Sequence, residues 1–519
     1  MELIKKNIHR NRQKGRVVSQ VTLDDDFIVP DTKEDMDALI LDGNNVEIGE
    51  SRIMGSRCVV KGQLAFRVLY HAQKSRMVDN VEGSIAFDET INVNDMAEDD
   101  DLQVDWEVED MTATMINSRK LNIKAVVTLT VTAWQLCDEE VSVDVDASQE
   151  VETASQYIET AEIAVQTRDT YRVKEEVELS SSKPNIAEIL WQSLEPRGIE
   201  CRPLDGKLSI HGEMELFCIY RAQEEHIPLQ WVERSIPFSG ALELPDCTDE
   251  MIPDIDIRPV HREVEAKADY DGETRLLAVE AVLELSIRLY EEGRVEALSD
   301  IYCPGADVVL ETGTAELERL VTRNASKYKM TDKLILDGAD KILQICHADG
   351  SVKLDSMEAV ENGLAVEGTL CVDVLYVAAD DESPVRSIRG MLPFSYTIEA
   401  GGIKPECTYR VRPGLEQLGA VLLGNGELEI KAVIVLDCLV MEQMAVPAIL
   451  SARVEPLDDQ KLAEMQGIIG YVAQPGDTLW KIAKKFYASV ESIREINDLG
   501  TDEVSPGRRL LIVKQTEKL

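Results

Sequence analysis

An internal repeat constrains this chain more than any other feature. Three segments share one pattern, in which a glycine and an alternating run end in an aliphatic residue and a tyrosine; they are Gly62–Tyr70, Gly212–Tyr220 and Gly368–Tyr376. The glycines lie 150 and 156 residues apart, and each segment is followed by a second landmark ending at Phe87, Phe238 or Phe394. Solenoid repeats are only about 20–50 residues long, so each copy is expected to be a domain of its own.

A long alternating segment completes each copy. Its apolar residues recur at every second position, and the opposite face carries polar residues such as Asn122, Lys124 and Glu280. This period of two predicts a half-buried strand of an antiparallel sheet. The apolar faces are Leu121, Ile123, Ala125, Val127, Leu129 and Val131; Leu277, Val279, Ala281, Leu283, Leu285 and Ile287; and Leu428, Ile430, Ala432, Ile434, Leu436 and Cys438. Before each copy, a Pro or Gly precedes a segment with a helical appearance (30–40, 182–190, 337–345).

These landmarks predict a mainly β protein. Single cores stop growing at about 250–300 residues, so a chain of 519 residues needs several. We expect three tandem β-rich domains, sandwich or barrel-like, at 1–150, 151–310 and 311–450. A linker at 451–468 and a small βααβ domain at 469–515 are expected to follow.

Composition limits the partners. The formal net charge of −43 disfavours binding to nucleic acids or anionic membranes. The sequence contains no run of about 18 apolar residues, so no membrane span is predicted. The basic start, MELIKKNIHRNRQKG, lacks the apolar stretch of a signal peptide. The ten cysteines form no CxxC pair, so we expect reduced, buried thiols in a cytosolic protein. The basic residues 5–16 are expected to form a frayed terminus.

The C-terminal segment has a different character. From 469 to 519, eight basic residues nearly balance seven acidic ones. Within it, Leu479, Ile482, Ala483 and Phe486 follow the spacing of an amphipathic helix, which Asp477 or Thr478 can cap. Ser489 can cap a second helix. Short strands are expected on either side of the helix pair.

Two family resemblances add to these inferences. Residues 471–513, which begin YVAQPGDTLWKIA, resemble a LysM domain almost throughout. The opening VTLDDDFIVPDTKEDMDALI (21–40) resembles that of the SPOCS domain of Firmicutes sporulation proteins, and the likeness extends over about 15–445 in three copies. The combination is similar to spore coat morphogenetic proteins. It implies a mother-cell cytosolic protein, at the forespore surface and in the coat, that binds other coat proteins and the polymerising morphogenetic ATPase.

The LysM resemblance also implies a binding groove. LysM domains bind N-acetylglucosamine polymers in a groove that here involves Gly476, Asp477, Thr478, Leu479, Asn497, Asp498 and Leu499. Several of these residues can equally serve as helix caps or core. A cytosolic protein meets no peptidoglycan, so protein docking is the second possibility. Trp480 lies one position off the apolar stripe, and Ile468, Ile469 and Tyr487 can extend the same patch. Edge-of-core packing is the alternative role for Trp480.

No enzymatic constellation is found in the sequence. GxxxxGK[ST], GxSxG and HExxH are absent, and the acidic runs lack EF-hand spacing. No catalytic, cofactor or metal residue is therefore predicted. Two alternatives to a coat scaffold stay open: a carbohydrate-binding protein of the wall or cortex, which would need export, and an enzyme with an unfamiliar site in the repeats.

Overall fold

The structure is a computed structural model that describes residues 1–98, 100–224, 229–335, 341–380, 382–423, 426–457 and 467–513. Each repeat contains six antiparallel strands in two three-stranded sheets. The strands of the first repeat are β1 (Glu2–Ile28), β2 (Met36–Met54), β3 (Arg57–Ala72), β4 (Val78–Asn92), β5 (Asp101–Asn117) and β6 (Lys120–Asp146). Its sheets have the orders β1-β6-β5 and β2-β3-β4.

The other two repeats have the same topology. The second has sheets β7-β12-β11 and β8-β9-β10, and the third has β13-β18-β17 and β14-β15-β16. Their strands are β7 (Glu152–Glu178), β8 (Ile186–Leu204), β9 (Lys207–Ala222), β10 (Gln230–Glu243), β11 (Ile252–Ala268), β12 (Thr274–Tyr302), β13 (Asp307–Ile335), β14 (Ile342–Val360), β15 (Gly363–Ala378), β16 (Val385–Glu399), β17 (Thr408–Leu423) and β18 (Glu427–Glu455).

The two sheets of each repeat enclose one hydrophobic core. The predicted alternating faces lie at the centre of these cores, on β6, β12 and β18, and none of their residues is more than 3% exposed. The two other landmarks pair across neighbouring strands, because Gly62 is opposite Phe87, Gly212 opposite Phe238 and Gly368 opposite Phe394. The tyrosines Tyr70, Tyr220 and Tyr376 are buried. The predicted mainly β fold with tandem β domains is therefore confirmed, and the domains are sandwiches.

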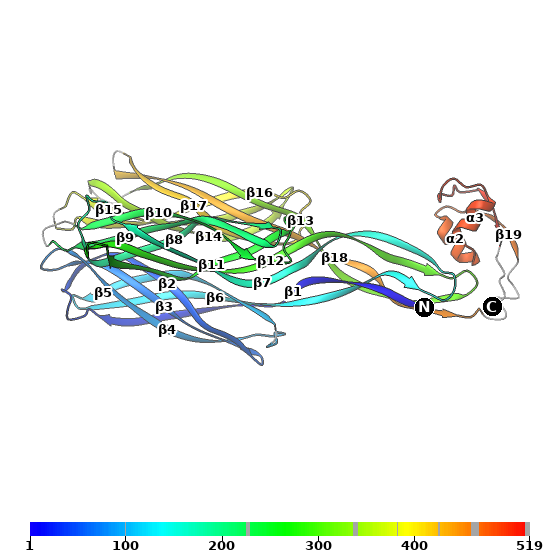
Figure 1. Cartoon of the computed structure of the whole chain (residues 1–519), viewed down its shortest axis with the longest axis horizontal. Coiled ribbons are helices and arrows are strands. Elements are labelled where there is room, and N and C mark those ends of the chain that lie inside the picture. Colours follow the sequence, from blue (N-terminus) through cyan, green and yellow to red (C-terminus); the bar gives the residue numbers. More distant parts are fainter. Residues whose placement is uncertain are drawn as a thin grey trace.

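The three sandwiches pack around a common axis. One apolar cluster between them takes three buried residues from each repeat: Ile40, Leu69 and Val78; Leu190, Phe217 and Ile219; Cys346, Leu375 and Val385. Burial of these nine side chains joins the repeats, so they form a single head instead of separate beads (Figure 1). All ten cysteines are free, and seven of them are buried.

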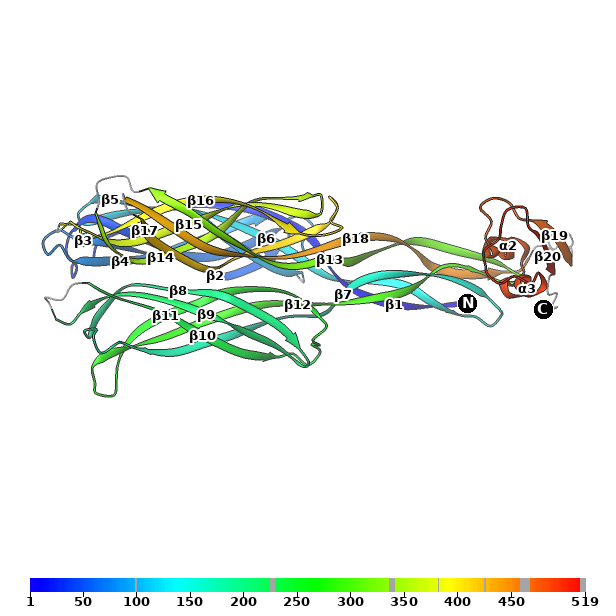
Figure 2. The ribbon, with the colours of Figure 1, turned by 90° about the horizontal axis from the view of Figure 1, so that it is seen from above.

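The longest strands run beyond the sandwiches and form a stalk. The outer halves of β1 and β6, of β7 and β12, and of β13 and β18 make three two-stranded ribbons that extend from the head side by side (Figures 1 and 2). A register shift marks the point where each ribbon leaves its sandwich, near Gly15, Tyr290 and Thr322. Such bulges bend a strand pair and increase its twist. The ribbons share an apolar core that includes Ile8, Ile158 and Leu317.

Three expectations about the repeats and their ends are corrected. The segments with a helical appearance begin the strands β2, β8 and β14, as far as residues 337–345 are described. In each strand, two register shifts bury residues four apart, Met36 and Ile40, Ile186 and Leu190, or Ile342 and Cys346, which imitates a helical period. The linker expected at 451–468 starts too early, because β18 continues to Glu455; residues 458–466 lie outside the described part.

The third correction concerns the basic residues 5–16. They do not fray but lie in β1 within the stalk. Acidic residues of the stalk and head pair with them: Lys5 with Glu140, Lys6 with Glu162 and Lys14 with Asp100. Backbone pairing with β6 holds this segment in place, and carboxylates that are distant in sequence neutralise its charge.

A small module follows the stalk. Its elements are β19 (Ile468–Val472), α2 (Leu479–Phe486), α3 (Val490–Ile496) and β20 (Arg509–Val513), in the predicted βααβ order. The helices lie toward the stalk, and the two-stranded β19–β20 sheet lies on the side away from it (Figures 1 and 2). Among the described residues, no helix combines the length and apolar character required for a membrane span.

Candidate functional site

The loop before α2 is held by its own polar side chains. Asp477 accepts hydrogen bonds from the backbone N–H of Gln474 and from the hydroxyl of Tyr471, both at 2.8 Å, and these bonds lower the pKa of Asp477. Thr478 is the N-cap residue of α2 and accepts from the N–H of Lys481 at 3.2 Å. Gly476 has a φ of +88°, which favours glycine. The side chains of Asp477 and Thr478 thus have structural roles.

Asn497 fastens the loop after α3 to strand β20. Its amide nitrogen donates to the carbonyls of Ile493 (2.8 Å) and Leu511 (2.7 Å), and its carbonyl oxygen accepts from the N–H of Leu511 (2.7 Å). The side chain therefore occupies the edge of β20 as a further strand would. Leu479 and Leu499 are buried in the module core, whereas Gly476, Thr478 and Asp498 are exposed.

We predict that Asn497→Ala destabilises the C-terminal module by about 2–3 kcal/mol, because three hydrogen bonds of about 1 kcal/mol each are lost. Hydrogen exchange of β20 in the full chain measures this loss. Ser505→Ala is the control, since Ser505 is an exposed loop residue of the same module. Unchanged exchange of β20 in the Asn497 variant would show that this side chain does not hold the loop.

Two of the four docking candidates face the stalk. The indole nitrogen of Trp480 donates to Asp300 at 2.9 Å, and its ring meets that of Tyr302 edge-on, with centroids 4.8 Å apart. The hydroxyl of Tyr487 donates to Asp307 at 2.5 Å. The alternation expected at the first strand is present, because Ile468 is 64% exposed while Ile469 packs on the module core.

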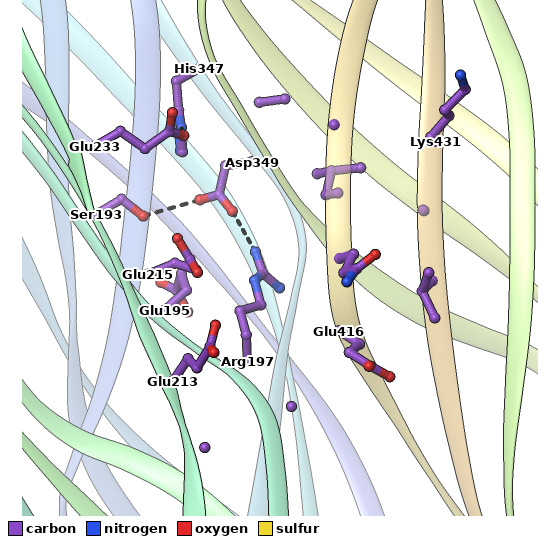
Figure 3. Close-up of a pocket in the computed structure, with 18 of the residues that line it drawn as sticks. Ser193, Glu195, Arg197, Glu213, Glu215, Glu233, His347, Asp349, Glu416 and Lys431 are labelled. Carbon is purple, nitrogen blue, oxygen red and sulfur yellow. Dashed lines mark hydrogen bonds and ion pairs between the residues drawn. The ribbon is translucent and has the colours of Figure 1, made fainter. Parts of the chain in front are cut away.

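A cavity of about 970 Å³ lies in the head between the second and third repeats. At its wall, Asp349 accepts from Ser193 at 3.1 Å and pairs with Arg197 at 2.9 Å, which ties β14 to β8 (Figure 3). Glu195 pairs with Arg262; burial raises its pKa against the opposing effect of that arginine. His347 contacts Glu233 at 2.9 Å. The Asp349–Arg197 and His347–Glu233 contacts connect the third repeat to the second, so the cavity lies at an interface between repeats.

Comparison with protein families identifies the parts. The family model described as SipL, SPOCS domain matches residues 37–116, 185–267 and 341–423, and the LysM domain model matches residues 471–513. The chain consists of three SPOCS domains followed by a LysM domain. No curated protein and no solved structure was found to match it. Both families are binding domains without catalytic activity of their own, and the SPOCS family places the protein in sporulation.

Each SPOCS match covers only the four inner strands of its sandwich, for example β2 to β5 in the first repeat. The first and last strands, which also form the stalk, lie outside the matched residues. In the described part of the chain, no cluster of His, Cys, Asp and Glu has the arrangement of a metal site.

Sequence reasoning missed the acidic residues at the stalk tip. Asp300 and Asp307 receive the LysM side chains Trp480 and Tyr487, but in the sequence they look like ordinary solvated carboxylates. Their only signal is that they flank the turn between two long alternating segments. The binding roles of the groove and docking residues of the LysM domain remain predictions, because the structure gives only their contacts and exposure.

Proposed function

We propose that this protein is a non-enzymatic assembly scaffold of the spore coat, which acts in the mother-cell cytosol. In this proposal the LysM domain binds the polymerising morphogenetic ATPase at the forespore surface, and the SPOCS head binds other coat proteins. One observation carries it: the stalk separates the LysM domain from the head (Figures 1 and 2), and the distal β19–β20 sheet exposes apolar side chains.

The exposed apolar residues of the distal strands are suited to a protein contact. Ile468, Val472 and Leu511 are 64%, 46% and 45% exposed, and they belong to the two paired strands β19 and β20. Ile468 and Val472 are four residues apart in β19, and side chains of a strand alternate between its faces, so the two share one face. Exposed apolar side chains grouped on a small domain are typical of interaction sites.

The head supplies a different kind of surface. Because residues 469–519 are nearly neutral, almost the whole net charge of −43 belongs to the head and stalk. An acidic surface of this size attracts basic partners and raises their association rate. The head is therefore proposed to recruit coat proteins with basic surfaces.

The second candidate function is binding of peptidoglycan or another N-acetylglucosamine polymer. It is favoured by the LysM match and by the exposure of Gly476, Thr478 and Asp498 in the two loops of the family groove. The two functions place their contacts on different residues of one domain, so substitutions can separate them.

We expect Ile468→Glu to weaken binding of the full chain to the purified ATPase by at least about tenfold, because it places a charge in an apolar contact. Ile335→Glu is the matched control, since Ile335 is 71% exposed in β13 of the head. Asp498→Asn is expected to leave ATPase binding unchanged; asparagine tolerates the φ of +52° at this position.

A parallel sedimentation assay with insoluble peptidoglycan completes the test. If peptidoglycan retains the wild-type chain, Asp498→Asn weakens that retention and the ATPase is not bound, the carbohydrate function replaces the scaffold function. Equal loss of ATPase binding in the Ile468 and Ile335 variants would show that the β19–β20 sheet is not the contact.

A further inference from the structure

One side of the LysM domain is occupied by the stalk tip. Asp300, at the end of β12, uses both carboxylate oxygens: one accepts from the Trp480 indole at 2.9 Å, and the other pairs with Lys484 at 2.5 Å. Both partners lie on α2. The carboxylate of Asp300 therefore neutralises Lys484 and also accepts the hydrogen bond of Trp480, the only tryptophan of the LysM domain.

Tyr302 inserts into the LysM core from the same strand. It is 3% exposed, belongs to the apolar cluster of the LysM domain, and donates its hydroxyl to the carbonyl of Ala488 at 2.9 Å. Burial is the main reason why its pKa is raised, and the neighbouring Glu152 adds to that increase. A stalk residue thus forms part of the LysM hydrophobic core. The contact is therefore more than two surfaces that touch.

Two further strands contribute polar contacts. Asp307, at the start of β13, accepts from the hydroxyl of Tyr487 at 2.5 Å. Glu152, at the start of β7, accepts from the backbone N–H of Val490 at 3.3 Å, at the first residue of α3. The contacts therefore come from the ribbons of the second and third repeats, around the turn that joins β12 to β13.

We propose that the stalk tip is a latch, which closes on the LysM domain and covers Trp480, so that a protein partner of this LysM face must displace it. The part that concerns the partner rests on the proposed function, with the ATPase contacting Trp480 and Tyr487 in addition to the distal strands. The distal β19–β20 sheet with Ile468 stays accessible in the latched state, whereas the indole N–H of Trp480 and the hydroxyl of Tyr487 are held by the stalk and are freed only on release.

The latch is intramolecular, since only residues 456–467 separate β18 from β19. Short connections give effective concentrations on the order of 1 mM. A contact with an intrinsic Kd of about 0.1 mM would then be closed roughly ten times as often as it is open. The apparent affinity of a partner that needs the open state is its intrinsic affinity multiplied by the open fraction, about one tenth here, so release of the latch should strengthen binding by about tenfold.

Asp300→Lys tests this in the full chain, because lysine cannot accept from the indole and repels Lys484. Glu296→Lys is the matched control: Glu296 lies on the same strand, is exposed, and undergoes the same change of charge. Tyr487→Phe is a second variant that removes one latch hydroxyl without changing charge. Hydroxyl-radical footprinting measures the accessibility of Trp480, hydrogen exchange measures the amide of Val490, and titration with the ATPase measures affinity.

In Asp300→Lys, we expect severalfold faster oxidation of Trp480, faster exchange near Val490 and about tenfold tighter ATPase binding. Tyr487→Phe should show a smaller change in the same direction, and Glu296→Lys none. Unchanged footprinting and exchange in both latch variants would overturn the latch. An opened domain with unaltered ATPase affinity would overturn the competition with a partner. If the latch opens but no variant binds the ATPase, the proposed function fails, and the competition with it, while the latch contact stands.

Discussion

Asp254→Ala is expected to lower the free energy of unfolding of the head by about 3–5 kcal/mol, the range for removing one partner from a buried ionic group. Asp254 lies in β11 with a side chain that is 0% exposed. It pairs with Arg410 and with Arg412 (2.5 Å) from β17 of the third repeat, and with Arg288 (3.6 Å) from β12 of its own. Without the carboxylate, three guanidinium groups remain together in a poorly hydrated place.

The same cluster reaches the first repeat. The Arg410 and Arg288 guanidinium groups lie 4.5 and 5.0 Å from the ring of Trp134, which belongs to β6. Loss of Asp254 should therefore loosen the packing of all three sandwiches, which urea unfolding and hydrogen exchange of β17 would detect. Glu263→Ala is the control, because Glu263 is half exposed on the same strand. Similar losses for the two variants would contradict the central role of Asp254.

The contribution of Asp254 also depends on pH. Burial would raise its pKa, but Arg412, Arg410 and Arg288 together lower it to about 2. A carboxylate with a lowered folded-state pKa stabilises fully above its unfolded pKa of about 3.9 and loses this effect as the pH falls toward 2. The difference between wild type and Asp254→Ala should therefore shrink by about 2–3 kcal/mol between pH 5 and pH 2.

Gly368→Ala is expected to destabilise the third sandwich by about 3 kcal/mol, through overpacking. A Cβ at this position would lie 2.4 Å from the carbonyl oxygen of Lys353 and 2.7 Å from the ring of Phe394. The Lys353 oxygen belongs to the backbone of the neighbouring strand β14, so it cannot move away as a side chain could. Thermal unfolding of the full chain measures the effect on the third repeat.

The equivalent glycine of the second repeat provides a matched comparison. At Gly212 the nearest atoms, from Phe238 and Ile199, would be 3.0–3.2 Å from the new Cβ, so Gly212→Ala should cost only about 1 kcal/mol. Gly419→Ala, where no atom lies within 4 Å, should change stability by less than about 0.5 kcal/mol. Equal losses at Gly212 and Gly368 would show that backbone freedom, and not the space beside Phe394, explains the repeated glycine.

Local patterns were enough to predict much of this protein. The alternation of Leu121 to Val131 and its two counterparts indicated the central strands, because side chains of a strand alternate between faces whatever its partner is. The spacing of Leu479, Ile482 and Phe486 likewise indicated α2, and Thr478 and Ser489 are the N-cap residues of the two helices. Repetition at intervals of 150 and 156 residues indicated three copies of one domain.

Other features depended on contacts between residues that are far apart in the chain. The paired bulges of β2, β8 and β14 shift burial to a spacing of four, so a local period predicted the wrong structure. Residues 5–16 looked frayed because the carboxylates that pair with them, such as Glu140 and Glu162, are more than 130 residues away.

The stalk and its latch also depend on contacts that local sequence patterns do not predict. Alternation in the sequence indicated the central parts of β6, β12 and β18 as strands, but it did not determine that these strands continue beyond their sandwiches as ribbons or pack on one another. Likewise, the helical pattern placed Trp480 beside the apolar stripe, whereas Asp300 and Tyr302 decided which surface it meets. Periodicity specifies which face of an element is apolar; which distant element covers that face is decided by the packing of the whole chain.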